Sequence, residues 1–183
     1  MLYSPDGKGP FPGIIVIHEF WGLNDWVKEQ ASKLADQGYV ALAVDDLHAA
    51  FEFLKSQANV KKDRTASIGW CWGGGYSLDV ALQEPTLTAD VINYGHLAVD
   101  TESLKKINAA ILGIFGGKDR GIPVEDVKKF DQQLKQMGKK VEIVIYPEAG
   151  HGFENPNNRD GYRADDAADA WKRTIDFLKR TLK

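Results

Sequence analysis

The segment Gly69-Trp70-Cys71-Trp72-Gly73 holds the only cysteine of this chain and joins the apolar run Thr65 to Gly69 to a stretch with helical spacing. It has the form G-x-C-x-G, the pattern of a nucleophile elbow with a thiol in place of the hydroxyl. A strand that turns at once into a helix strains the backbone of the central residue, and larger side chains at the two glycine positions would collide. The pattern predicts that Cys71 stands at a helix N-terminus, where the helix dipole favours the thiolate.

Strand-like and helix-like runs alternate on both sides of this segment. The strand-like runs are short, β-branched and without polar alternation, which is typical of strands buried on both faces. The helix-like runs place apolar residues at helical spacing and end at a glycine or before a proline. The expected strands cover residues 14–17, 39–44, 65–69, 91–94, 110–115 and 141–146, and the expected helices cover residues 25–37, 47–54, 72–83, 123–137 and a terminal stretch that contains 171–182.

Strands separated by helices in this way predict the α/β fold class, with about six mostly parallel strands and helices on both faces of the sheet. We expect a single domain over residues 1–183, which is either complete or cut from a longer protein. In such sheets, ligands bind at the carboxyl ends of the strands. Glu19, Cys71, Asp119 and His151 each follow an expected strand, so we expect them to lie at the same edge of the sheet.

The composition argues against several classes of protein. With 43% hydrophobic and 27% charged residues the chain is globular rather than disordered, and its net charge of -3 gives no electrostatic reason to bind nucleic acid or a membrane surface. No apolar run approaches the ~18 residues of a membrane span. One cysteine forms neither an internal disulfide nor a cysteine-rich zinc site, and neither a P-loop nor a dinucleotide fingerprint is present. We therefore expect a cytoplasmic monomer or small homo-oligomer without a metal or cofactor.

Four motifs, in this order along the chain, resemble those of the dienelactone hydrolase family of α/β-hydrolases. They are HEFWGLN at 18–24, GWCWGGGYS at 69–77, FGGKD at 115–119 and PEAGHGF at 147–153. The resemblance extends from about residue 10 to the C-terminus and includes the terminal helix. It implies an α/β-hydrolase fold and hydrolysis of a small-molecule ester or lactone.

The resemblance also implies a catalytic triad of Cys71, His151 and Asp119. In this triad His151 takes the proton of the thiol, and Asp119 fixes the tautomer and orientation of the imidazole. Glu19 matches a family glutamate that contacts the resting thiol and is displaced when substrate binds. We expect this glutamate to couple thiolate formation to substrate binding.

Further residues are implied around the triad. The oxyanion hole consists, by the resemblance, of the backbone amides of Phe20 and Trp72. Trp21, Tyr94 and Phe153 fall where walls of the substrate pocket are expected.

Each site residue also has an ordinary structural interpretation. A lone cysteine is commonly an inert buried residue, and Asp119 is suited to cap the helix near Pro123. A histidine in a loop or a glutamate on the surface needs no function. The elbow, together with Asp119 and His151 in the family's chain order, favours catalysis over these interpretations.

Other titratable residues have simpler explanations. The remaining three histidines lack a partner pattern and are expected to be structural, and the aspartates at 45 and 46 are expected to cap a helix. The aspartates at 165, 166 and 169 are expected to form a solvated helix face rather than a metal cluster.

The chain departs from the family pattern in three places. Only about ten residues precede the first long strand, so the usual N-terminal antiparallel strands are expected to be missing. The family's long segment after the second strand is also missing, so we predict either a very tight turn or a break in the chain at Asp45–Asp46. Family members bind the carboxylate of dienelactone with arginines, one in that missing segment and one soon after the histidine. Here the histidine is followed by Gly-Phe-Glu-Asn-Pro-Asn-Asn, and Arg159 comes late.

A thiol nucleophile restricts the substrates. A thiolate leaves a tetrahedral intermediate more easily than an alkoxide, so the intermediate collapses backwards unless the leaving group is a comparably weak base. We therefore expect turnover of enol, aryl or other activated esters and lactones. Two alternatives remain: a thiol-based binding or redox-sensing module, and a catalytically weak remnant of the family.

Overall fold

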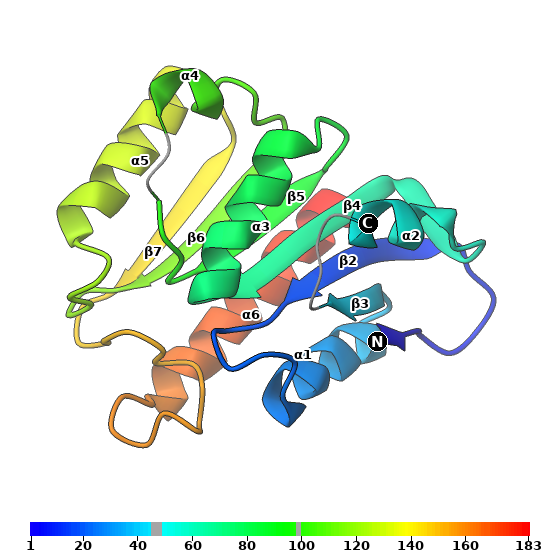
Figure 1. Cartoon of the computed structure of the whole chain (residues 1–183), viewed down its shortest axis with the longest axis horizontal. Coiled ribbons are helices and arrows are strands. Elements are labelled where there is room, and N and C mark those ends of the chain that lie inside the picture. The colour runs from blue at the N-terminus through cyan, green and yellow to red at the C-terminus, as the bar shows by residue number, and fades with distance from the viewer. Residues whose placement is uncertain (45–48, 98–99) are drawn as a thin grey trace.

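The computed structural model describes residues 1–44, 49–97 and 100–183. At its centre is a seven-stranded sheet with the strand order β1-β3-β2-β4-β5-β6-β7 (Figure 1). All neighbouring strands from β3 to β7 run parallel, and β1 pairs antiparallel with β3 at the edge. The strands are β1 (Leu2–Tyr3), β2 (Phe11–Ile17), β3 (Val40–Val44), β4 (Val60–Trp70), β5 (Ala89–Asn93), β6 (Ala110–Gly116) and β7 (Val141–Tyr146).

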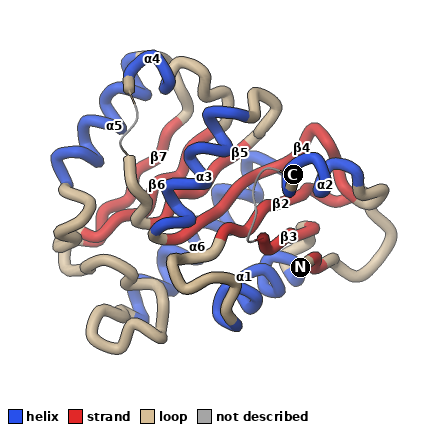
Figure 2. Tube along the Cα trace, viewed as in Figure 1, coloured by secondary structure: helices blue, strands red, loops and turns tan. Residues whose placement is uncertain are grey.

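Helices cover both faces of this sheet (Figure 2). One face carries the first and last helices, the other carries three helices from the middle of the chain, and a short helix lies in the connection between β5 and β6. The helices are α1 (Asp25–Asp36) and α6 (Ala164–Leu182) on the first face, α2 (Ala50–Ser56), α3 (Trp72–Gln83) and α5 (Val124–Gln136) on the second, and the short α4 (Thr101–Leu104).

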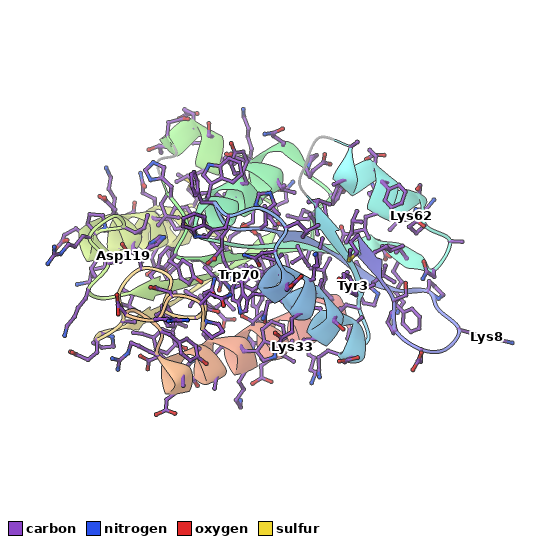
Figure 3. The ribbon with its side chains drawn as sticks, turned by 60° about the horizontal axis from the view of Figure 1, so that its bottom comes forward. Tyr3, Lys8, Lys33, Lys62, Trp70 and Asp119 are labelled. Carbon is purple, nitrogen blue, oxygen red and sulfur yellow. The ribbon has the colours of Figure 1, made fainter. Side chains whose placement is uncertain are left out.

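Strand β2 explains why the strands read as continuous apolar runs. Ile14 and Val16 pack into the cluster beneath α1 and α6, whereas Ile15 and Ile17 pack into the cluster beneath α2 and α3. Successive side chains of a strand point to opposite faces, so a strand covered on both faces buries every residue. Trp70, at the end of β4, lies in the interior, whereas Lys8 projects at the periphery (Figure 3).

The predicted α/β fold with a mostly parallel sheet is confirmed, and the structure adds some elements to it. The two-residue strand β1 supplies one antiparallel neighbour at the N-terminus, which is too short to produce a sequence periodicity. Strand β4 begins at Val60, before the expected start at Thr65. Its first half was not predicted because Lys61 to Arg64 are exposed and polar and so lack the pattern of a buried strand. Helix α4, with four residues, likewise has no detectable period.

Two expectations concern residues that lie outside the described ranges. The tight turn or chain break at Asp45–Asp46, and the capping role of those aspartates, fall within residues 45–48.

Among the helices of the described ranges, none is long and apolar enough to cross a membrane.

The connection from β4 to α3 depends on glycine at two positions. A Cβ atom on Gly69 would lie 2.0 Å from the carbonyl oxygen of Gly73, and one on Gly73 would lie 2.3 Å from the carbonyl oxygen of His18. Real Cβ atoms do not approach backbone atoms this closely, so any larger residue must displace the helix from the sheet. The backbone of α3 therefore packs directly against the ends of β4 and β2.

We predict that Gly69→Ala destabilises the protein by about 3 kcal/mol or more, because the added methyl group overpacks a backbone contact. The matched control is Gly75→Ala, since a Cβ atom there meets nothing closer than 3.6 Å. Alanine is the better helix former by about 1 kcal/mol, so this control is expected to be neutral or stabilising. Urea denaturation of both variants measures the difference, and equal stabilities would contradict the packing argument.

Candidate active site

Cys71 occupies the sharp turn between β4 and α3. Its backbone has φ 56° and ψ -118°, a region that residues with a side chain rarely adopt. Its amide donates to the carbonyl oxygen of Asn93 (3.0 Å), and its own carbonyl accepts from the amide of Gly74 (3.0 Å). These two bonds hold the strained turn, and the thiol is presented at the first turn of a helix.

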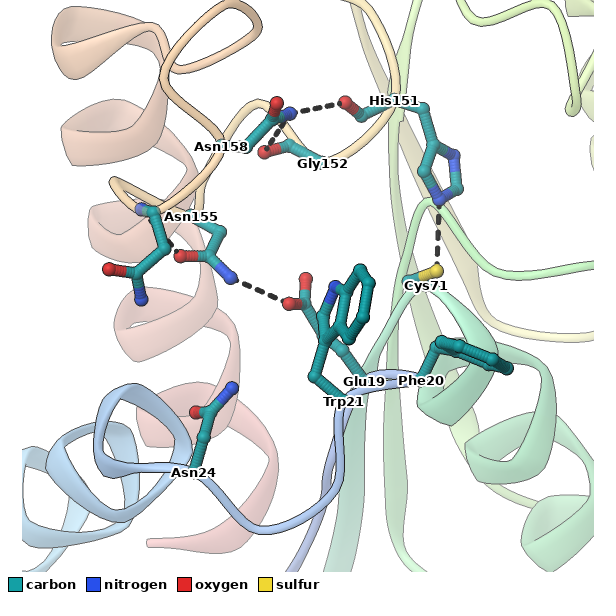
Figure 4. A pocket seen from close by; sticks show the side chains of 10 residues that line it. Glu19, Phe20, Trp21, Asn24, Cys71, His151, Gly152, Asn155 and Asn158 are labelled. Carbon is teal, nitrogen blue, oxygen red and sulfur yellow. Dashed lines mark hydrogen bonds between the residues drawn. The ribbon is translucent and has the colours of Figure 1, made fainter.

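His151 lies in the loop that follows β7 and reaches back over this turn. Its Nε2 atom is 3.0 Å from the Cys71 sulfur (Figure 4). Its Nδ1 atom is 2.7 Å from Oδ2 of Asp119. The edge of the ring contacts the Tyr94 ring, with the ring centroids 5.2 Å apart. The histidine is thus bonded at both nitrogens, one to the thiol and one to a carboxyl group.

Asp119 lies in the loop after β6, and its side chain is fully buried. Its Oδ1 atom accepts hydrogen bonds from the amides of Gly121 (2.8 Å) and Ile122 (3.1 Å). Burial opposes ionisation, but the hydrogen bond and charge of His151, together with these amides, hold the pKa of Asp119 below its ordinary value. A buried carboxylate with this many donors is a fixed negative charge beside the imidazole.

The pKa of His151 is raised from 6.5 to about 10, first by its hydrogen bond to Asp119 and next by its hydrogen bond to Cys71. Because two groups that can carry negative charge flank the ring, the protonated imidazolium is the favoured form. An imidazolium 3.0 Å from a sulfur in turn stabilises the thiolate. The imidazole nitrogen is therefore placed to exchange a proton with the thiol.

Glu19 follows β2 and is buried beside the thiol, with 5% of its surface exposed. Asn155 donates its side-chain amide to Oε2 (2.6 Å), and the Tyr94 hydroxyl donates to Oε1 (3.3 Å). Burial raises the pKa of Glu19, although both hydrogen bonds and the charge of His151 act in the opposite direction. Among the described residues, the Glu19 carboxyl group is hydrogen-bonded to Asn155 and Tyr94, and the Cys71 sulfur is hydrogen-bonded to His151. The expected contact between Glu19 and the thiol is therefore not among these bonds.

A third buried acid of the site, Glu154, was not predicted from the sequence. The Trp70 indole donates to its Oε2 atom (3.2 Å), and its Oε1 atom has no partner among the described residues. Burial, and then the charge of Glu19, raises the pKa of Glu154 to about 8. Glu154 and its neighbour Asn155 directly follow the last family motif. In the sequence, the one signal for these two residues is that they are polar and adjoin that motif.

Phe20 lines the same cavity as Cys71, and Trp72 follows Cys71 directly in the chain, so the backbone amides of both residues lie in segments that adjoin the thiol. Trp72 is the first residue of α3, where an amide has no acceptor within the helix. The amide of Phe20 has no acceptor in the part of the chain that the structure describes. Two unpaired amides beside a nucleophile can receive the oxygen of an attacked carbonyl group.

A cavity of about 550 Å³ opens next to Cys71. Trp21 lines it, with 77% of the residue exposed, whereas Tyr94 and Phe153 are fully buried. These last two rings pack behind His151 instead, with their centroids 5.7 Å apart. The lining residues are Glu19, Phe20, Trp21, Asn24, Cys71, His151, Gly152, Asn155, Asn157 and Asn158.

Within residues 1–44, 49–97 and 100–183, no three histidine, cysteine or acidic side chains come together as a metal ion would require. The described residues around Cys71 supply a thiol, an imidazole, buried carboxyl groups and backbone amides. These are the groups used in acyl transfer.

Comparisons with known proteins identify the family and the fold of this chain. The family model for the dienelactone hydrolase family matches residues 1–45 and 43–182. A Methylorubrum extorquens protein, provisionally named a carboxymethylenebutenolidase, is 32% identical, and the match covers 96% of this chain and 74% of that protein. A Bradyrhizobium protein, named a probable 2-oxo-3-(5-oxofuran-2-ylidene)propanoate lactonase, is 29% identical over 97% of this chain and 87% of its own. The solved structure of a dienelactone hydrolase-like promiscuous phosphotriesterase from metagenomic libraries has a TM-score of 0.91 and 25% identity, covering 99% of this chain and 91% of that one.

The family match is divided at one place in the chain. Its two segments meet at residues 43–45, where the sequence indicates a shortened connection after the second long strand. The match to the Methylorubrum extorquens protein extends over 217 aligned residues, more than this chain of 183 residues contains. That relative therefore has residues with no counterpart here.

The position of Glu154 leads to a prediction about stability and pH. Its pKa is raised from 4.5 to about 8 by folding, so the folded protein binds this proton more tightly than the unfolded chain. The contribution of Glu154 to the free energy of unfolding should therefore be full below about pH 4.5 and be lost as pH rises to about 8. Glu154→Gln mimics the protonated acid and removes this dependence.

The measurement is urea denaturation of both proteins at pH 5, 6.5 and 8. Relative to Glu154→Gln, the wild type should lose at least about 1 kcal/mol over this range, since one pKa unit corresponds to 1.36 kcal/mol. A constant difference between the two proteins would mean that the carboxyl group is ionised throughout.

Proposed function

The chain belongs to the dienelactone hydrolase family, and from this membership we propose that it hydrolyses small-molecule carboxylic esters or lactones with Cys71 as the nucleophile. The observation that carries the proposal is the bonded series Asp119, His151, Cys71 at the mouth of a cavity. The names of the relatives support the reaction class, since they denote lactone hydrolases.

In the proposed reaction, His151 takes the proton of the thiol and Asp119 stabilises the resulting imidazolium. The sulfur attacks the carbonyl carbon of the substrate, and the oxyanion that forms accepts hydrogen bonds from the amides of Phe20 and Trp72. The carbon–oxygen bond to the leaving group then breaks, and His151 returns the proton to the departing oxygen. The product of this half-reaction is a thioester on Cys71.

Water completes the cycle by attacking the thioester carbonyl group. His151 removes a proton from that water, the same oxyanion hole receives the negative charge, and the thiolate departs as the carboxylic acid forms. No cofactor takes part in any of these steps. In the structure Glu19 is bonded to Asn155 and Tyr94, which leaves the sulfur free to pair with His151 as the reaction requires.

We predict that the enzyme gives a burst of p-nitrophenol from p-nitrophenyl acetate, stoichiometric with Cys71, because an activated ester acylates the thiol faster than water deacylates it. Iodoacetamide should abolish the burst, since this chain has a single cysteine. Cys71→Ala should lose it as well, with turnover lowered by about 10⁴-fold. Rapid-mixing absorbance measurements test this prediction.

The same experiment distinguishes the redox-sensing alternative. Peroxide would then oxidise Cys71 while p-nitrophenyl acetate gives no burst, and mass spectrometry would detect the oxidised thiol without an acyl adduct. A catalytically weak remnant would give neither result at a useful rate.

We further predict a strong dependence on the leaving group. The tetrahedral intermediate returns to substrate when the leaving group is a stronger base than the thiolate, so p-nitrophenyl acetate and an enol lactone should be hydrolysed far faster than ethyl acetate. The measurement is kcat/KM for the three substrates. Equal values on all three would show that breakdown of the intermediate does not limit the reaction.

A further inference from the structure

The cavity beside Cys71 has no lysine or arginine side chain to receive a negatively charged substrate. None of its lining residues is lysine or arginine, and residues 45–48 and 98–99, which the structure does not describe, contain neither. The two arginines nearest in sequence to site residues, Arg120 and Arg159, are exposed and do not line it. A carboxylate on the substrate would therefore have no partner, and an unpaired buried charge is costly.

The cavity also presents a negative group of its own. Both oxygens of Glu19 accept hydrogen bonds, from Asn155 and Tyr94, and these two donors stabilise its ionised form against the rise in pKa that burial causes. In Figure 4 this carboxyl group lies between the Trp21 ring and the side chain of Asn155. The positive charge that can form on His151 is already paired with Asp119. A substrate carboxylate would thus face repulsion with nothing to offset it.

The remaining lining groups suit a neutral, flat substrate. Phe20 and Trp21 form an edge-to-face pair with centroids 5.5 Å apart, and they are 72% and 77% exposed. Exposed rings gathered at the mouth of a cavity are suited to a flat apolar group, against which they can stack.

Uncharged amides provide the polar part of the lining. Asn157 is exposed at the cavity. Asn24 uses its Oδ1 atom to cap α1, and among the described residues its amide nitrogen has no hydrogen-bond partner. Asn158 donates to the carbonyl oxygens of His151 and Gly152, which leaves its own oxygen as an acceptor. Such groups bind neutral polar atoms of a ligand and do not compensate a full charge.

We propose that this site selects uncharged esters and lactones that carry a flat apolar group, and that Glu19 excludes their carboxylated counterparts. The proposal rests on the hydrolase function proposed above and names its substrate class. It assigns to Glu19 a role in specificity that is separate from any contact with the thiol.

Two pairs of isosteric esters test the proposal. The first pair is 4-nitrophenyl 4-carbamoylbenzoate and 4-nitrophenyl 4-carboxybenzoate, with the charge on the acyl side. The second is 4-carbamoylphenyl acetate and 4-carboxyphenyl acetate, with the charge on the leaving group. Each kcat/KM is divided by the rate of uncatalysed hydrolysis of the same ester, so that only recognition by the protein is compared.

In at least one pair the carboxamide should be preferred by roughly 100-fold, since like charges in an interface cost several kcal/mol. Glu19→Gln should reduce this ratio about tenfold or more, because it removes the charge and keeps the shape. The matched control is Glu154→Gln, which changes a buried acid behind Trp70 that does not line the cavity, so the ratio should stay as in the wild type.

The outcomes separate the two proposals. If none of the four esters is hydrolysed, the proposed hydrolase function has failed. If all are hydrolysed and both normalised ratios are near one, only the proposed selectivity is overturned. A high ratio that Glu19→Gln leaves unchanged would overturn the role of Glu19.

Discussion

The direct backbone contact between the end of β4 and the first turn of α3 is the constraint on which the site depends. Gly69 and Gly73 meet with no room for a side chain between them, and the carbonyl group of His18 closes the same contact from β2. Because the helix begins this close to the sheet, the residue between them, Cys71, adopts a positive φ of 56°. Cys71 is presented by this geometry, and the position of its sulfur is set by backbone atoms rather than by its own side-chain contacts.

The acids of the site differ in their pKa shifts: the pKa of Asp119 is lowered, whereas those of Glu19 and Glu154 are raised. Asp119 is buried but satisfied by two amides and His151, so it stays ionised and favours an imidazolium. Glu19 and Glu154 are also buried, with fewer donors, and their pKa values are raised. A fully ionised set of three acids would leave the interior with more negative charge than the single imidazolium offsets. The raised pKa of Glu154 reduces that charge at neutral pH.

Much of the fold could be predicted because its signals are local. The buried strands lack polar alternation, and the helices have clear apolar spacing, so β3, β6, α3 and β7 appear close to their expected bounds. The missing parts lack such signals. Strand β1 has two residues and helix α4 has four, and the first half of β4 is polar because it is exposed.

The site was predictable to a different degree. Chain order and motifs are enough to bring Cys71, Asp119 and His151 to one edge of the sheet, and the distances agree. The burial of individual side chains could not be predicted from the sequence in the same way. Tyr94 was expected to line the pocket but packs under His151, and Glu154 could not be identified because its role depends on Trp70, 84 residues away. Such pairings exist only once the chain has folded.

A second close contact fixes the position of Cys71 independently of the loops that line the cavity. The backbone of Gly74 meets that of Gly95 just after β5, so that a Cβ atom on Gly95 would lie 2.3 Å from the carbonyl carbon of Gly74. Helix α3 is therefore held against β2, β4 and β5 at its first turn, by main-chain atoms alone. The cavity walls come instead from the loops after β2 and β7, which do not contribute to this clamp beyond His18. Loss or exchange of residues in those loops changes what the cavity admits without moving the thiol, so substrate preference has to be inferred from this chain's own lining and not from its motifs.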